Sequence, residues 1–191
     1  MDKLALLLHP VRMRIIWAFA GDRLRTTADL CASLPDVPKT TVYRHVALLV
    51  EGGVLEVAGE QRVRGAVERH FRVRRDRAAI TPAAGAGMSL DDHRQAFAAA
   101  MAALLAEFDA YLNRAGADPA ADLIGYRQGI LWLSPAELQE TIAEIQTVLA
   151  ARSRNGPTAG RHPRLLSMIQ FPTEQHDPAP DSGTGLTGTQ G

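Results

Sequence analysis

The sequence predicts a mainly α-helical protein with a small β component, and three observations lead to this expectation. Apolar residues recur at helical spacing in several segments, three of these segments begin with a capping signal, and apolar alternation is confined to short stretches. The 191 residues, 46% of them hydrophobic, are enough for a buried core, and a single cysteine, Cys31, excludes a disulfide framework. No signal-peptide core or membrane span can be drawn, so we expect a cytoplasmic protein.

Three short helices with tight connections are expected before residue 54. Proline or a capping box opens each of them, and glycine or proline ends each of them. They begin at Pro10, Thr26 and Pro38. The third helix ends at the glycine pair 52–53, and its buried stripe is predicted to be Val42, Val46 and Leu49.

Two stretches with β character follow these helices. Residues 54–57 and 67–73 flank a turn-rich basic stretch, 59–65, and this pattern predicts a β-hairpin. Three helices followed by a hairpin with a basic tip is the order of a winged helix-turn-helix. We therefore expect a DNA-binding domain over residues 1–77.

A long helix is expected after a connector at residues 78–88. Ser89 and Asp92 form a capping box, and the helix from Leu90 to Arg114 carries an apolar stripe that one small domain cannot cover. A second copy of the chain is the natural cover. The predicted dimerisation residues are Phe97, Met101, Leu104, Leu105 and Phe108.

A small α/β unit is expected at the end of this dimerisation region, which spans residues 89–171 and is also the place for an effector. Strands are predicted at 124–133 and 165–171, with a helix between them that starts at Ser134 and has Glu137 in capping-box position. Their pairing, parallel or antiparallel, stays open. Residues 172–191 are rich in Pro, Gly, Ser and Thr and are expected to be disordered.

Charge is unevenly distributed along the chain although the net charge is zero. Residues 1–80 contain 14 Lys or Arg against 9 Asp or Glu, whereas residues 81–191 contain 7 against 12. Phosphate backbones attract a local excess of basic residues and repel an acidic one. The distribution therefore indicates nucleic-acid contact by the N-terminal half alone.

The outer face of the third helix and the hairpin tip carry the predicted DNA contacts. Basic side chains bind guanine acceptors or phosphates, hydroxyls bind phosphate or base, and a tyrosine contacts a thymine methyl. The alternatives are a plain solvated helix face and a solubilising loop, and His45 is expected to be a half-buried packing residue. The predicted DNA-binding residues are Lys39, Thr40, Thr41, Tyr43, Arg44, Gln61, Arg62 and Arg64. The cluster of Arg72, Arg74, Arg75 and Arg77 is weaker evidence, because such arginines are also found simply solvated or paired with acidic residues.

Three segments resemble the winged-helix domain of ArsR-like bacterial transcriptional regulators. They are residues 8–12 (LHPVR), 40–46 (TTVYRHV) and 51–55 (EGGVL), and the resemblance covers about residues 3–74. Residues 126–134 and 164–172 resemble the C-terminal part of an actinobacterial branch of these regulators. The resemblance implies a homodimer that binds a near-palindromic operator and is often released by an effector.

Metal sensing, which many ArsR-like proteins perform, is not expected here. Cys31 stands alone where their thiolate sensors carry a motif. Asp91, His93 and Glu107 fit the zinc pattern of the long helix, but the remaining position is Leu104. We therefore expect no metal site and no cofactor. We also expect no enzyme, because the sequence contains neither a phosphate-binding loop nor a nucleophile in a catalytic setting.

The sequence thus predicts a homodimeric transcriptional regulator with double-stranded DNA and itself as partners and no membrane. A repressor is the expected type, but the sequence leaves open whether the protein represses or activates and whether it has a small-molecule effector. The alternative is a small-molecule-binding or protein-interaction module that uses a winged-helix scaffold. A basic surface formed jointly by Lys39, Arg44, Arg62 and Arg64 distinguishes the first from the second.

Overall fold

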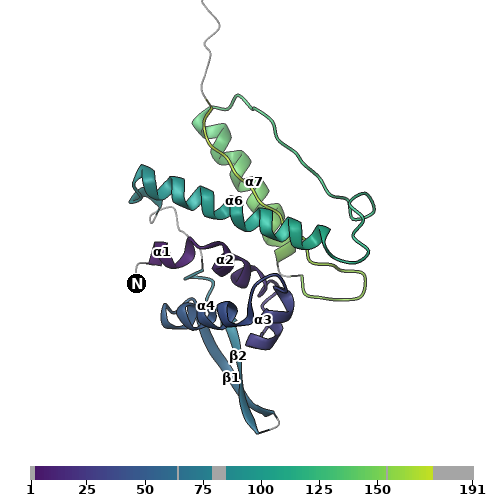
Figure 1. The fold of residues 1–191 in the computed structure, drawn as a ribbon. Helices are drawn as coiled ribbons and strands as arrows, with labels where there is room; N and C mark the ends of the chain where they lie inside the picture. The colour runs from purple at the N-terminus through teal and green to yellow at the C-terminus, as the bar shows by residue number, and fades with distance from the viewer. Residues whose placement is uncertain (1–2, 64, 79–84, 154, 174–191) are drawn as a thin grey trace, which may run out of the picture. The chain divides into compact units, whose positions relative to one another are not determined.

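The computed structural model describes residues 3–63, 65–78, 85–153 and 155–173. The chain divides into two compact units, residues 1–161 and 162–191. Within the described ranges it forms six helices and a two-stranded antiparallel sheet (Figure 1). The expected fold class, mainly helical with a small sheet that follows an N-terminal helix-turn-helix region, is confirmed. None of the described helices is long and apolar enough to span a membrane.

Four short helices form the N-terminal part. They are α1 (Lys3–Leu7), α2 (Pro10–Trp17), α3 (Thr27–Ser33) and α4 (Lys39–Glu51). The capping box predicted at Thr26 and Asp29 is present, and α4 ends at the predicted glycines, where Gly53 has a φ of 68° that favours glycine. A Cβ atom on Gly52 would lie 2.1 Å from Leu6 Cδ2, so any other residue there would displace the buried Leu6 side chain of α1.

The core lies between these helices and the base of the hairpin. The predicted α4 stripe is confirmed, since Val42, Val46 and Leu49 are all buried. These side chains pack in one cluster with residues of α1, α2 and α3 and with the base of the sheet: Leu6, Leu7, Ile15, Phe19, Leu30, Leu34, Val54, Leu55 and Phe71. Burial of this apolar surface is the main favourable contribution to folding of the domain.

The hairpin is longer than the sequence predicts. Strands β1 (Leu55–Val63) and β2 (Ala66–Val73) pair in antiparallel register with a bulge between Val57 and Gly59, so most of the stretch expected as loop is strand. Leu55 and Phe71 anchor its base, and the backbone of Phe71 also pairs with Arg25. The outer half leaves the core, and Val67 is 55% exposed. The hairpin therefore projects as a wing (Figure 1).

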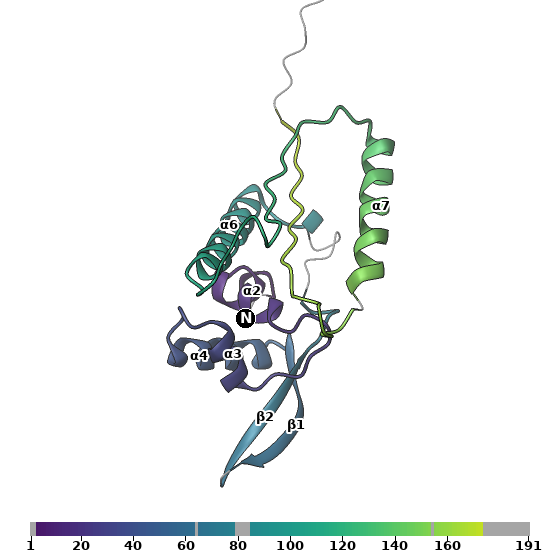
Figure 2. The same ribbon diagram turned by 90° about the vertical axis from the view of Figure 1, so that its right-hand side faces the viewer.

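The long helix α6 (Leu90–Leu112) begins at the predicted capping box of Ser89 and Asp92. It packs on α2, and its fully or nearly buried residues are the small Ala99 and Ala103. Figure 1 and Figure 2 both show α2 between α6 on one side and α4 on the other. The hairpin lies on the α4 side, so α6 is remote from the wing.

The expected C-terminal α/β unit is wrong in its strands. Residues 124–134 and 155–173 contain no strand, and between them only α7 (Pro135–Ser153) is regular, capped as predicted by Ser134 and Glu137. Alternation of apolar residues shows which face would be buried, but a strand also needs a partner edge, and the described residues offer these segments none. Instead, Trp132 is 73% exposed, and α7 has no buried residue.

Three sequence-based expectations fall outside the described residues. Arg64 does so, and so do most of the connector (79–84) and the tail from residue 174 onward.

His45 is a packing residue of α4, as its position beside Val42 and Val46 predicted, but it is buried rather than half-buried. It is only 3% exposed, its ring centroid lies 4.4 Å from that of His9, and its Nδ1 lies 3.5 Å from Arg12 Nη1. Its Nε2 has no hydrogen-bond partner among the described residues. Burial lowers the pKa of His45 to about 4, with His9, Arg12 and Arg44 adding to the effect, so the ring is neutral at neutral pH.

We expect His45 to make the fold acid-sensitive. Between pH 6.5 and about 4 the unfolded chain binds a proton at this ring and the folded chain does not, so stability is complete above pH 6.5 and falls as the pH drops through this window. His45→Gln should remove this part of the loss, about 2 kcal/mol between pH 7 and pH 5. Urea unfolding at the two pH values measures it.

The control is His93→Gln, at an exposed position on α6, which should keep the wild-type loss. The pKa of His9 is also lowered, mainly by burial, so a smaller pH dependence in the same direction should remain in His45→Gln. An undiminished loss in His45→Gln would show that the ring is not held neutral.

Candidate nucleic-acid interface

The outer face of α4 presents the predicted residues to solvent. Burial of Val42, Val46 and Leu49 turns the other side of the helix outward, because positions three and four apart share one face. Tyr43 is 57% exposed, and Thr41 is half-buried. The remaining members of the predicted set on this helix, Lys39, Thr40 and Arg44, are exposed.

The wing supplies a second exposed polar group. Gln61 and Arg62 lie near the end of β1, opposite Glu68 and Val67 of β2, and both are exposed. Gly65, in the turn between the strands, has a φ of 86°, a value that favours glycine. The pairing places Arg62 one residue from the end of the strand, on the part of the wing farthest from the core.

Most arginines of the hairpin and of the segment after it are paired within the N-terminal half. Arg69 contacts Glu60 at 3.0 Å, Arg72 contacts Glu56 at 2.6 Å, and the next arginines contact Asp22, Glu56 or Asp76. From the sequence alone, the Arg72–Arg77 cluster could either bind phosphate or pair with acidic residues. The structure shows pairing, and the partners come from the N-terminal half.

Lys39, Arg44 and Arg62 differ from these arginines. Across the described ranges none of the three forms an ion pair within 4 Å. Their charge is therefore not cancelled by a neighbouring carboxylate and is available to an anionic ligand. Unneutralised positive charge therefore lies on α4 and on the outer part of the wing, and within the described ranges Arg23 and Arg25, between α2 and α3, also form no ion pair.

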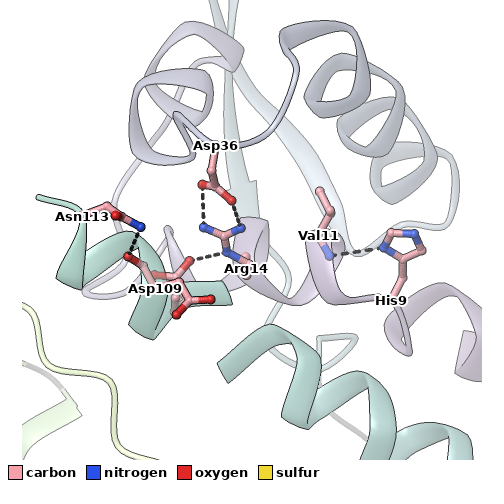
Figure 3. A network of polar contacts seen from close by, with 7 residues as sticks. His9, Val11, Arg14, Asp36, Asp109 and Asn113 are labelled. Carbon is pink, nitrogen blue, oxygen red and sulfur yellow. Dashed lines mark hydrogen bonds and ion pairs between the residues drawn. The ribbon is translucent and has the colours of Figure 1, made fainter. Parts of the chain in front are cut away.

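Two buried arginines on α2 have structural partners that sequence reasoning missed. Arg12 donates to the carbonyl oxygens of Ala5 and Leu6, and so provides hydrogen bonds to carbonyl groups at the end of α1 that have no donor within the helix. Arg14 bonds Asp36 with both terminal nitrogens, at 2.6 and 2.9 Å (Figure 3). Its Nε also donates to Glu107 Oε1, at 2.6 Å. The sequence signal for both was a basic residue beside the core position Ile15.

The contact between Arg14 and Asp36 also shifts the pKa values of both side chains. Hydrogen bonding to Asp36 raises the pKa of Arg14, and the same bond lowers the pKa of Asp36. Glu107, which fits one position of the zinc pattern in the sequence, accepts a hydrogen bond from the guanidinium of Arg14.

A pocket of about 310 Å³, open to solvent, lies between α2 and the base of the wing. Its lining is largely apolar and includes Trp17, Phe19 and Val73, with Arg23, Arg72 and Arg75 also present. None of its lining residues belongs to the predicted DNA-binding set. A ligand in this pocket would therefore leave the outer face of α4 unoccupied.

Comparison with known families agrees with this geometry. Residues 7–58 match the family model of a helix-turn-helix domain. The N-terminal part of this chain contains a helix-turn-helix domain. The match begins just before α2 and ends within β1, so it includes α3 and α4, the two helices that give the domain its name. No curated protein shows a significant match to the chain.

A helix-turn-helix domain indicates DNA as a partner and a regulator of transcription as the type of protein. In such domains the second helix of the pair enters the major groove. In this chain the second helix is α4, which carries the exposed Lys39 and Arg44.

Proposed function

We propose that this chain is a homodimeric transcriptional repressor that binds a near-palindromic operator in double-stranded DNA, with the wing as a second contact. One observation supports this most strongly. On a helix-turn-helix scaffold, Lys39 and Arg44 of α4 and Arg62 of the wing are exposed and form no ion pair with the residues that the structure describes. By contrast, Arg69, Arg72 and Arg75 are paired. Such a regulator acts in the bacterial cytoplasm, where the chromosome lies.

Helix α4 recognises the DNA sequence in this proposal. Arg44 binds guanine O6 and N7, Tyr43 contacts a thymine methyl, and Lys39 near the helix start binds phosphate or guanine. Thr40 and Thr41 offer hydroxyls to phosphate or base. All five lie on the part of α4 that the core leaves outward or half-covered.

The wing is the positioning element. Gln61 and Arg62 bind the DNA backbone beside the groove that α4 occupies, or enter the minor groove. Because contacts to phosphate are independent of sequence, the wing adds affinity and orientation while α4 adds specificity.

Homodimerisation through α6 brings two such domains onto one operator. The face of α6 turned away from α2 is apolar: Leu105 is 62% exposed, and Met101, Leu104 and Phe108 are half-buried. Phe108 packs edge-on against Tyr126 at 6.1 Å, which extends the apolar surface into the segment that follows α6. A second copy covers this surface, because a soluble monomer rarely exposes an apolar patch of this extent.

The alternative function is a small-molecule-binding or protein-interaction module, and the pocket beside α2 is the observation in its favour. Both functions coexist if the pocket holds an effector. Selection of binding sites from a random DNA pool by the full-length protein distinguishes them. A repressor enriches a near-palindromic sequence and lowers reporter transcription from it, whereas a module without DNA function enriches no sequence.

Arg44 and Arg62 should contribute in different ways. We expect Arg44→Ala to weaken binding to the selected operator by about 1 to 3 kcal/mol and to relax specificity at one base position. Arg62→Ala should weaken binding to all sequences alike and make the salt dependence shallower by about one unit of slope. Fluorescence anisotropy over a salt series measures both.

The matched control for these two variants is Arg72→Ala. This exposed arginine is already bound to Glu56, so its loss should change affinity much less than the loss of Arg44. Equal losses in Arg44→Ala and Arg72→Ala would contradict the division into DNA-binding and paired arginines.

The outward face of α6 should hold the dimer together. Leu104→Glu combined with Leu105→Glu places two charges in that face, and we expect monomers that bind only half-sites weakly. Ala102→Glu is the control, since Ala102 is exposed on the same helix outside the apolar stripe, and it should remain dimeric. Sedimentation equilibrium with an operator gel shift is the measurement. A double variant that still dimerises and binds normally would assign the interface elsewhere.

A further inference from the structure

Arg14 joins three elements that are far apart in the sequence. Its side chain is 2% exposed, and its guanidinium binds Asp36, in the turn between α3 and α4, and Glu107 of α6. The two terminal nitrogens of Arg14 face the two oxygens of Asp36 (Figure 3). A bidentate pair of this kind fixes direction as well as distance.

The α6 end of this contact is sterically fixed. Ala99, Ala103 and Glu107 are spaced by four residues and share one face of the helix. The two alanines are buried, and their small side chains allow α6 to approach α2 closely enough for Glu107 to reach Arg14. A rotation or a slide of α6 on α2 therefore breaks the 2.6 Å contact between Glu107 and Arg14.

The Asp36 end lies directly before the recognition helix. Asp36 is separated from Lys39, the first residue of α4, by only Val37 and Pro38. No side chain caps the start of α4, and the first backbone bonds there run from Thr41 and Val42 to the carbonyl of Pro38. The position of this turn, which Arg14 holds through Asp36, therefore sets where α4 begins.

We propose that the Glu107–Arg14–Asp36 contact joins α6 and α4 into one rigid unit. A dimer built on α6 then holds its two α4 helices at one separation and binds tightly only to operators with one half-site spacing. The inference rests on the proposed function. Glu107 is then a positioning residue: it touches no DNA and acts through Arg14.

The contact can be broken on one side without dismantling the other. In Glu107→Gln the neutral pair of Arg14 and Asp36 remains, so the turn before α4 keeps its partner while α6 loses its charged link. Asp109→Asn is the matched control, because it removes the same charge two residues along α6 at an exposed carboxylate without an ion pair in the described ranges. Both variants remove one negative charge from the same turn of α6, so their difference reports the contact itself.

The experiment compares the full-length wild type with both variants on three DNAs. These are the operator selected by the wild type, the same operator with 2 base pairs inserted between its half-sites, and a single half-site. The insertion moves one half-site by about 7 Å and turns it by roughly 70°, which a rigid dimer cannot follow. Sedimentation confirms that each protein is dimeric, and thermal unfolding confirms that it is folded.

We expect the wild type and Asp109→Asn to lose at least about 10-fold in affinity on the insertion. Glu107→Gln should lose less than about 3-fold on the insertion, bind the original operator about 10-fold more weakly than wild type, and bind the half-site unchanged. If Glu107→Gln also bound the half-site about 10-fold more weakly than wild type, Glu107 would merely support the fold of the DNA-binding domain, and the proposal would be overturned. Unchanged spacing discrimination in Glu107→Gln, or loss of its dimer, would also overturn it.

Three further outcomes are informative. If Glu107→Gln does not fold, Glu107→Asp is measured in its place, since it keeps the charge but is one methylene too short for the contact, and the same criteria apply. If the wild type enriches no DNA sequence at all, the proposed function fails. If the wild type selects an operator and only the spacing result is negative, this inference alone fails.

Discussion

Arg14 carries its positive charge where water hardly reaches, and both carboxylates that neutralise it come from other elements. A charge in such a place is tolerated only with well-placed partners, so the arginine imposes directions that apolar packing does not. Helix α2 thereby organises the domain. It contacts α6 on one side and α4 on the other, and its second arginine, Arg12, secures α1. The apolar core drives folding, while these ionic contacts determine how the helices are set against one another.

Pairing separates the basic residues of α4 and of the hairpin region into two groups. Arg69, Arg72 and Arg75 each hold a carboxylate of the same domain and so stiffen the hairpin and its attachment. Lys39, Arg44 and Arg62 hold none in the described ranges. A count of positive charges along the chain cannot separate these groups, because the segment densest in arginine is also the one whose arginines are paired. The free positive charge belongs to fewer residues than composition implies.

Local features of the sequence were predictable, and long-range ones were not. The boxes at Thr26 and Ser89 and the α4 stripe follow from spacing within a few residues, and the structure contains them. Contact between Arg14 and Glu107 spans 93 residues and leaves no local trace beyond a basic residue next to Ile15. The strands expected at 124–133 and 165–171 failed for a related reason. Their apolar alternation is real, but whether it becomes a strand depends on an edge that no local pattern specifies.

The alanines on the inner face of α6 have a consequence for sequence tolerance. At position 103 the side chain is completely buried against a neighbouring helix, so the space available ends at one methyl group. In a library of all single substitutions, position 103 should accept little besides glycine, alanine and serine, because a larger residue pushes the two helix backbones apart. Position 102, which faces solvent, should accept almost any residue that keeps the helix. The separation of α2 and α6 is thus encoded by the smallness of two side chains, and mutational tolerance along α6 should rise and fall with the turn of the helix.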